Sequence, residues 1–443
     1  MSVAARAGRS RLPVYLLCWI CLIADGYDLM SYGATLPALI GGEPFHLTVA
    51  RAGHIGSLAL AGMLAGSLTA GTLTDRVGRR RIFIASVTVF SVGMLLTALA
   101  PTVEMFVAFR VLTCFGVGGL LPTAVALASE FASPETRSRT LGFVLTGPPL
   151  GMVAAAFLAS RVVEEHGFRP VYAAAGVILL VVPLLVRYLP ESPSFLAARG
   201  DAASATLVRT TYGLPVPAQP AVAATGPAST VGSPVAALLR GRLLVPTLLI
   251  WGTTFFSLLT VFGITTWLPQ VMAKSGYGLG SSITFLLVYC LGAVIGTLIA
   301  ASLADRFGPK PLVIVGYVCA AVALLAVATE PATGALVVLV LLAGFGGFGT
   351  QNILNDFIAR FYPASMRASG LGWALGVGRL GAIVGPTFGA WVVSGKDPLA
   401  ATATAFAVTA VLGAVVMALV PRAARADAYT PSTTNEVAEE VAR

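Results

Sequence analysis

The chain consists largely of long apolar blocks, and this pattern restricts the fold more than any other feature. A block of about 20 apolar residues is long enough to cross the hydrocarbon core of a bilayer as a helix. Twelve such blocks follow one another, and each is predicted to be a helix because lipid offers no partners for free backbone groups. Only 11% of the residues are charged, against roughly 25% in soluble domains, which agrees with a polytopic all-α membrane protein.

The predicted spans fall into two sets of six. The first set covers roughly residues 13–40, 53–74, 82–100, 103–131, 140–160 and 169–189. The second set covers roughly residues 242–272, 281–304, 311–329, 333–359, 367–394 and 399–420. This spacing predicts two six-helix halves, at residues 1–189 and 242–420. A linker at residues 190–241 joins them, and a tail at residues 421–443 follows.

The linker and the tail differ in composition from the spans. Residues 213–234 are rich in Pro, Ala, Gly, Ser and Thr and carry no charge, which predicts a flexible cytoplasmic linker. At the other end of the first half, three arginines precede the first apolar block. This block is longer than a signal core and contains two aspartates, so we expect an uncleaved first helix.

The distribution of basic residues predicts the orientation of the chain in the membrane. With both termini in the cytoplasm, most of the 28 Lys and Arg residues fall in inner segments. The predicted outer loops contain Arg51, Arg161, Arg169, Lys274 and Lys396, and the spans contain Arg110 and Arg379. The net charge of +9 is therefore an orientation signal, and it gives no reason to expect a nucleic-acid partner.

An internal repeat relates the two sets of spans. The loop "GTLTDRVGRRR" at residues 71–81 corresponds to "ASLADRFGPKP" at residues 301–311, an offset of 230 (301 − 71). The same offset relates "RSRTLGF", which begins at Arg137, to "RASGLGW", which begins at Arg367. Two related halves with this symmetry are typical of transporters that bind their substrate between the halves.

Several motifs resemble those of a known family. The "DRVGRRR" loop, its weaker copy, the twelve spans and the repeat together resemble the major facilitator superfamily, and this resemblance covers nearly the whole chain. Within it, "DGYD" at residues 25–28 resembles the signature of the aromatic acid/proton symporters, with support from "LPESPSFL", "GLLPTAVALASEFA" and "GVGRLGAIVGP". One departure is Thr123, where that family would have Asn after Pro122.

The resemblance implies a function. It implies a carrier in the cell (inner or plasma) membrane that imports a small aromatic carboxylate, benzoate-like or hydroxybenzoate-like, together with protons by alternating access. No cofactor or metal is implied, the partners are substrate, protons and lipid, and we expect a monomer.

The most unusual residues of the first span are Asp25 and Asp28. An ionised side chain within the bilayer costs several kcal/mol, and a carboxylate in a site of low dielectric constant exchanges protons more readily near neutral pH. The two residues are three positions apart, so they share a helix face and can point into one cavity. We predict that at least one of them couples transport to protons; the alternative is a structural pair.

Arg110 is the predicted partner of these acids. At 1.5 Å per residue it lies about 10 Å below the outer end of its helix, whereas Asp28 lies about 18 Å below its own helix end. A long arginine side chain can span much of this difference. We predict a counter-ion whose pairing depends on aspartate protonation, against the alternative of a permanent structural ion pair.

Arg379 is the predicted substrate ligand. It lies near the midplane of its span, and a guanidinium group can bind a carboxylate through two parallel hydrogen bonds. The alternative is a structural pair with an acid such as Asp356. Around it we predict aromatic and polar contacts to the substrate ring from Tyr32, Trp373, Gln351, Asn352 and Asn355, of which the last three are alternatively interhelical hydrogen-bonding residues.

The "DRVGRRR" loop has a separate predicted role. Asp75 is predicted to cap a helix start, and the arginines are predicted to pair with acids such as Glu130. By resemblance, such pairs hold the outward-open state and break as the halves move. The predicted gate consists of Asp75, Arg76, Gly78, Arg79, Arg80 and Glu130 in the first half, with Asp305 and Arg306 in the second.

Two other kinds of function stay open at this point. The chain is alternatively another carrier of the superfamily, either a sugar or metabolite symporter or a drug/proton antiporter; "TGPPLG" at residues 146–151 resembles a stretch found in the antiporters. From a different class, it is a membrane-embedded sensor or enzyme on a transporter scaffold. The sequence contains no nucleophile–base pattern, His/Cys cluster or phosphate loop, so we expect no enzyme.

Overall fold

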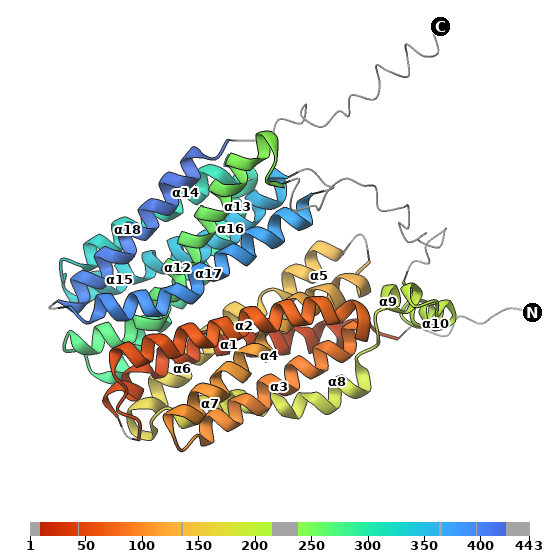
Figure 1. Ribbon diagram of the computed structural model, residues 1–443, viewed down its shortest axis with the longest axis horizontal. Coiled ribbons are helices and arrows are strands. Elements are labelled where there is room, and N and C mark those ends of the chain that lie inside the picture. Colours follow the sequence, from red (N-terminus) through yellow and green to blue (C-terminus); the bar gives the residue numbers. More distant parts are fainter. Residues whose placement is uncertain are drawn as a thin grey trace, which may run out of the picture.

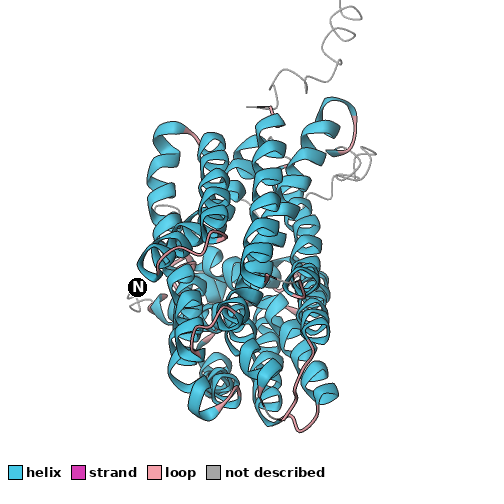
Figure 2. Cartoon of the chain, turned by 90° about the vertical axis from the view of Figure 1, so that its left-hand side faces the viewer, coloured by secondary structure: helices cyan, strands magenta, loops and turns pink. Residues whose placement is uncertain are grey.

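The computed structural model describes residues 9–42, 44–133, 136–214, 238–362, 366–395 and 397–421. Figure 2 shows helices and connecting loops throughout this part of the chain. Among the described residues, twelve helical segments are long and apolar enough to cross a membrane. The all-helical fold with twelve candidate spans is therefore confirmed.

The first half consists of spans between residues 12 and 188. Its helices are α1 (Leu12–Gly41), α2 (Val49–Val77), α3 (Arg79–Leu99), α4 (Val103–Phe131), α5 (Arg137–Val144), α6 (Gly147–His166), α7 (Arg169–Gly176), η1 (Val177–Val181) and α8 (Val182–Tyr188). Two short helices follow, α9 (Pro193–Ala198) and α10 (Ala202–Thr211), which begin at the N-caps Ser192 and Asp201. The segment predicted to be flexible lies almost wholly outside the described residues.

The second half repeats the pattern. Its helices are η2 (Gly241–Leu243), α12 (Leu244–Lys274), α13 (Leu279–Phe307), α14 (Pro309–Val327), α15 (Thr333–Gly344), the π-helical turn η3 (Phe345–Gly349), α16 (Thr350–Phe361), α17 (Arg367–Val393) and α18 (Pro398–Leu419). Figure 1 shows the two halves as separate bundles that lie side by side.

The fifth span differs from its prediction. The helix does not end near residue 160 but continues to His166, where Gly167 stops it with a φ of 67°. Arg161 and His166 therefore belong to the last turns of α6 and not to a loop. Polar residues at a helix end extend a span because they can reach the interface while the backbone remains helical.

The two ends of the molecule can be distinguished by the chain path. We call the end where the chain enters α1 and leaves α18 the terminal side, and the opposite end the distal side. The end of α10 lies on the terminal side, where Arg11 Nε donates to the Tyr212 carbonyl oxygen at 2.7 Å. Figure 1 shows the bundles closest on the distal side and diverging toward the linker and the termini.

Small residues bring the two halves together on the distal side. α2 and α17 run antiparallel, with Gly53 against Ala390 and with the hydroxyls of Ser57 and Thr387 2.7 Å apart. α1 contacts α12 where Gly33 lies against the Thr265 carbonyl oxygen. Because glycine has no Cβ, backbones approach closely at these points.

The same helices separate on the terminal side. Gly71 continues the α2 face that contacts α17, and Gly372 and Gly376 continue the α17 face that contacts α2. A Cβ atom added at any of these three glycines would meet no atom within 4 Å. The halves are therefore closed against each other on the distal side and apart on the terminal side.

Candidate functional site

Close packing of α1 on α6 sets the position of the two aspartates. A Cβ at Gly26 would lie 1.9 Å from the Pro148 carbonyl oxygen, and a Cβ at Gly151 would lie 1.9 Å from the Ile23 carbonyl oxygen. Glycine on both helices thus lets the backbones touch. With this face of α1 covered by α6, Asp25 and Asp28 are buried within the protein and away from lipid.

Asp28 forms an ion pair with Arg110 of α4. Arg110 Nη1 donates to Asp28 Oδ1 at 2.5 Å, and the side chains are only 2% and 3% exposed. The thiol of Cys114, one helical turn along α4, donates to Asp28 Oδ2 at 3.5 Å. The predicted contact between Asp28 and Arg110 is present, and both carboxylate oxygens have a donor.

Aromatic rings enclose the arginine of this pair. The guanidinium carbon of Arg110 lies 5.9 Å from the centre of the Tyr32 ring and 5.4 Å from that of Tyr172. The Tyr32 hydroxyl donates to the Ala52 carbonyl oxygen at 2.6 Å, and the Tyr172 hydroxyl lies 2.9 Å from Thr35 Oγ1. Both hydroxyls are thus occupied within the protein, and the substrate contact of Tyr32 stays a prediction.

A small cavity adjoins the ion pair at the interface of the two halves. Its volume is about 30 Å³. The first half contributes Asp28, Tyr32 and Arg110 to its lining, and the second half contributes Phe262, Thr266 and Pro386. A volume of this size suits about one water molecule and not an aromatic acid. The pair therefore faces the surface at which the halves meet.

Asp25 has a different environment from Asp28. Its side chain is 3% exposed, and Oδ1 has no hydrogen-bond partner among the described residues. A buried carboxylate oxygen without a donor is costly unless it is neutral or a cation lies nearby.

Arg379 links the second half to the first. Its Nη1 donates to Ser67 Oγ on α2. The alternative pairing with Asp356 is wrong, because Asp356 accepts a hydrogen bond from Arg360 Nε at 2.9 Å, one turn away on the same helix. Both arginines that the sequence places within spans therefore contact another helix. Arg110 contacts α1 within the first half, and Arg379 contacts α2 across the halves.

The polar residues of α16 divide into two groups. Asn352 donates to Thr297 Oγ1 of α13 at 3.1 Å, the interhelical role that the sequence left as the alternative. Gln351 donates to Asn355 Oδ1 at 2.9 Å, and its own Oε1 is buried without a partner in the described structure. The π-helical turn η3 directly precedes these residues, and such turns are frequent at functional sites.

Trp373 lies toward the terminal end of α17. Its ring stacks on Trp251 of α12 with centroids 5.8 Å apart and an interplanar angle of 25°. The side chain is 44% exposed, and neighbouring Gly372 adds no bulk. This pair presents a flat aromatic surface on the terminal side, two turns along the helix from Arg379.

The loop between α2 and α3 forms a polar cluster within the first half. Arg79 pairs with Glu130 of α4, and Ser192 Oγ donates to the other oxygen of that carboxylate at 2.5 Å. Glu191 Oε1 accepts from the backbone N–H groups of Arg80 and Ser192, each at 2.9 Å. Neither Glu191 nor Ser192 was predicted to belong to this cluster. The signal that could have indicated them was their place in the "PESPSFL" motif.

Two predictions for this loop are wrong. Arg80 does not pair with an acid, since its side chain donates to the Val186 carbonyl oxygen. Asp75 does not begin a helix, because it lies inside α2, and the N-cap of α3 is Gly78, whose φ of 111° few other residues tolerate. The side chain of Asp75 lies outside the described part of the structure.

The gating role of these residues stays a prediction. The Arg79–Glu130 pair is formed although the halves are apart on the terminal side, and both residues belong to the first half. The pair is thus present in the arrangement that is apart on the terminal side. Arg76 is exposed, Arg306 lies 5.4 Å from the centre of the Phe307 ring, and the side chain of Asp305 is not among those described.

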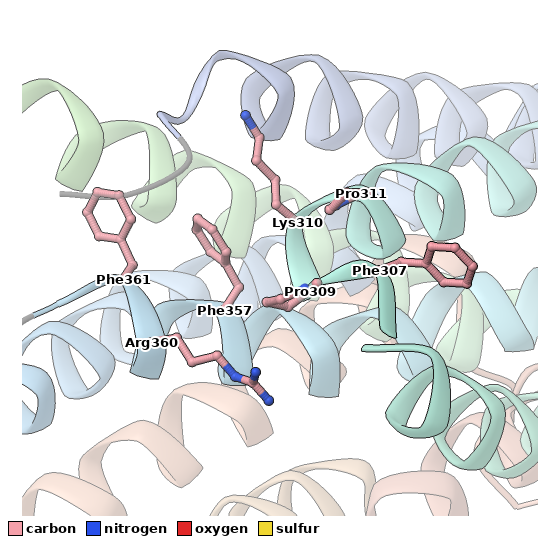
Figure 3. Close-up of a pocket in the computed structure, with 8 residues that line it drawn as sticks. Phe307, Pro309, Lys310, Pro311, Phe357, Arg360 and Phe361 are labelled. Atoms are coloured by element: carbon pink, nitrogen blue, oxygen red, sulfur yellow. The ribbon is translucent and has the colours of Figure 1, made fainter. Parts of the chain in front are cut away.

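A larger cavity, of about 570 Å³, lies at the terminal end of the second half (Figure 3). Lys310 and Arg360 line it with aromatic residues such as Phe357. Lys310 Nζ donates to the carbonyl oxygen of Ala418 at 2.9 Å and also to that of Val420, and Arg360 pairs with Asp356. Both basic side chains of this cavity thus already bind protein groups. None of the predicted substrate ligands lines the cavity.

Residues 18–386 and 281–442 match the family described as the Major Facilitator Superfamily. The chain belongs to this superfamily. It is 31% identical to the benzoate transport protein of Acinetobacter baylyi over 415 residues, which cover 92% of this chain and 89% of the relative. It is 34% identical to the gentisate transporter of Corynebacterium glutamicum over 426 residues, 95% of this chain and 90% of the relative.

Solved structures of the superfamily share the fold. A crystal structure of a D-xylose-proton symporter matches with a TM-score of 0.72 over 94% of this chain and 99% of that chain, at 18% identity. In the described part of the chain no group of three His, Cys, Asp or Glu residues is placed to hold a metal ion. The protein is a transporter of this superfamily, related to aromatic-acid transporters, and not an enzyme.

Proposed function

We propose that the protein imports a small aromatic carboxylate, of the benzoate or hydroxybenzoate class, together with protons. The observation that carries this proposal is the buried Asp28–Arg110 pair on the surface between the halves. A charged pair in this position is expensive to bury, and within membrane spans such residues usually serve transport. The relationship to the benzoate and gentisate transporters supports the substrate class.

The residues divide by proposed role. Asp25, Asp28 and Arg110 form the proton-coupling group. Arg379 binds the substrate carboxylate, for which its guanidinium has the matching charge and hydrogen-bonding geometry. Trp373, Gln351 and Asn355 contact the ring, and Tyr32 closes the wall beside Arg110.

The proposal includes orientation and movement. The terminal side is cytoplasmic, in keeping with the excess of basic residues in its loops, so the described arrangement is open to the cytoplasm. The halves move as two bodies about the substrate, and the glycine contacts on the distal side separate when the opposite side closes. The carrier acts as a monomer in the cell (inner or plasma) membrane.

The test is uptake by proteoliposomes that contain the purified protein. Labelled benzoate and gentisate should accumulate when the outside is more acidic than the lumen, and accumulation should collapse when an uncoupler is added. Protein-free liposomes are the control. Uptake that ignores the proton gradient refutes the coupling, whereas accumulation of glucose or ejection of a cationic dye refutes the substrate class.

A further inference from the structure

The larger cavity at the terminal end of the second half combines two basic side chains with aromatic rings. Its volume of about 570 Å³ is within the usual range of ligand pockets, and Lys310 of α14 and Arg360 of α16 line it. Phe307, Phe357 and Phe361 supply most of its apolar lining (Figure 3). A cavity with this lining suits an occupant that carries carboxylates together with small apolar side chains.

The last helix of the described chain ends at this cavity. Lys310 Nζ donates to the carbonyl oxygen of Ala418 at 2.9 Å and to that of Val420, at the C-terminal end of α18. Carbonyl oxygens are neutral, so these two hydrogen bonds do not remove the positive charge of Lys310. The described part of the chain ends one residue later, at Pro421. The tail that follows therefore begins beside the cavity.

The sequence of the tail has the complementary chemistry. Residues 427–442 read "DAYTPSTTNEVAEEVA" and contain four acidic side chains and no Lys or Arg. Three of these acids and two valines fall within residues 436–441, "EVAEEV". Carboxylates can bind the basic side chains of the cavity, and the valines can pack against its rings. The tail thus offers both kinds of group that the cavity lining calls for.

The length of the tail allows this segment to reach the cavity. Val437 follows Val420 by 17 residues, which span at most about 60 Å when fully extended. The starting point of this span is the carbonyl group that Lys310 binds. A segment tethered so close to a site meets it at an effective concentration on the order of 1 mM, so a weak intrinsic affinity is enough for occupancy.

We propose that residues 436–441 of the same chain occupy this cavity, with their carboxylates on Lys310 and Arg360 and their valines against the phenylalanine rings. The existing pair of Arg360 with Asp356 does not oppose this. Its side chains are 53% and 39% exposed, so water screens it, and a guanidinium group has five N–H donors with which it can bind a second carboxylate. The docked segment joins the end of α18 to α14 and α16.

Disulfide formation within the full chain tests the proposal. Pro311→Cys places a thiol on the cavity lining, and Val437→Cys places one in the tail. The control joins Val437→Cys with Gly372→Cys, which also lies on the terminal side and whose Cβ would meet nothing within 4 Å. Cys319 is half-buried and is replaced by serine throughout. The protein is held in nanodiscs of zwitterionic lipid, and each rate is divided by the maleimide labelling rate of the same cavity or control cysteine.

The cavity pair should form its disulfide about tenfold faster than the control pair at low salt, because docking raises the local concentration of the tail thiol. Replacing Glu436, Glu439 and Glu440 together by Gln should bring the cavity pair to the control rate. About 1 M salt should have the same effect, since it screens exposed charges. The glutamine variant leaves every described residue unchanged, so a folding defect of the helices does not imitate this result.

Three outcomes overturn the proposal. Equal rates for the two pairs are the result expected when a lipid headgroup, or nothing, fills the cavity. A fast cavity pair that ignores the glutamine changes shows that charge does not select the site. A disulfide that joins two copies of the chain, seen as a dimer, gives the cavity to the tail of a neighbour. None of these measurements requires transport, so the proposal and the proposed function are tested separately.

Discussion

Gly33 offers a direct test of how the two halves meet. A Cβ atom at this position would lie 2.0 Å from the carbonyl oxygen of Thr265, on α12 of the other half. Ordinary van der Waals contact begins near 3.4 Å, so Gly33→Ala requires α1 and α12 to separate by about 1.4 Å at this point. The neighbouring atom belongs to a helix backbone, which cannot rotate away as a side chain can.

The separation raises the free energy of the described state only, in which the distal side is closed. Overpacking at a close contact costs roughly 1–3 kcal/mol. In the proposed transport cycle the distal contacts open when the terminal side closes, and the added methyl group then has room. The substitution should therefore change the equilibrium constant between the two arrangements by about 5- to 150-fold, against the described state.

Access from the terminal side measures this shift. A cysteine introduced at Gly376 faces open space in the described state, whereas Cys18, Cys21, Cys114 and Cys290 are buried. Cys319 is half-buried and is first replaced by serine in all variants. Labelling of the introduced cysteine by a soluble maleimide should slow when Gly33→Ala is added, and the slowing approaches the change in the equilibrium constant where the described state becomes the minor one. Gly41→Ala is the matched control, because it lies on the same helix and its Cβ would meet nothing within 4 Å.

Two results would refute the reasoning. One is an unchanged labelling rate in a Gly33→Ala protein that unfolds at the wild-type temperature, because the interface would then tolerate the methyl group in the described state. The other is an equal slowing in Gly41→Ala, because the effect would then come from helix propensity and not from the contact with Thr265.

Three further predictions concern charged residues. Asp28→Asn leaves Arg110 buried without its counter-charge, which costs about 3–5 kcal/mol; proton-driven accumulation should be lost, and accumulation at the wild-type level would contradict this. Arg379→Ala should weaken benzoate binding by about 10- to 150-fold, the loss of one charge-assisted hydrogen-bonding site, while binding of neutral benzamide changes little; equal losses for both ligands argue against the carboxylate contact. Arg79→Ala removes a half-buried ion pair, so the free energy of unfolding should fall by about 1 kcal/mol in a denaturant titration, with Arg76→Ala, at an exposed position, as the control.

The twelve spans could be predicted from the sequence because lipid enforces a simple rule. A segment that crosses the bilayer must be apolar over about 20 residues and must satisfy its own backbone groups, so length and hydropathy are sufficient evidence. The same rule makes Asp28 and Arg110 conspicuous, and their contact could be predicted because each needs a partner of opposite charge. The estimated difference in depth between them did not prevent contact, since membrane helices tilt and arginine side chains are long.

Contacts that depend on helix rotation could not be predicted in this way. Ser67 binds Arg379 because α2 and α17 cross at that point, and no local pattern marks Ser67 among the other small residues of α2. Arg80 and Arg79 are adjacent in sequence, yet a turn of about 100° per residue sends one side chain to the Val186 carbonyl oxygen and the other to Glu130. Charge alone does not distinguish them.

The internal repeat gives the strongest argument that the buried charges serve transport. Shifted by 230 residues, Asp25, Asp28 and Arg110 correspond to Phe255, Leu258 and Val340 in the second half. The second half packs the same helices without these charges, so the fold does not need them. The acids lie on one half and Arg379 lies on the other, so any attraction between Asp25 and Arg379 changes when the halves move.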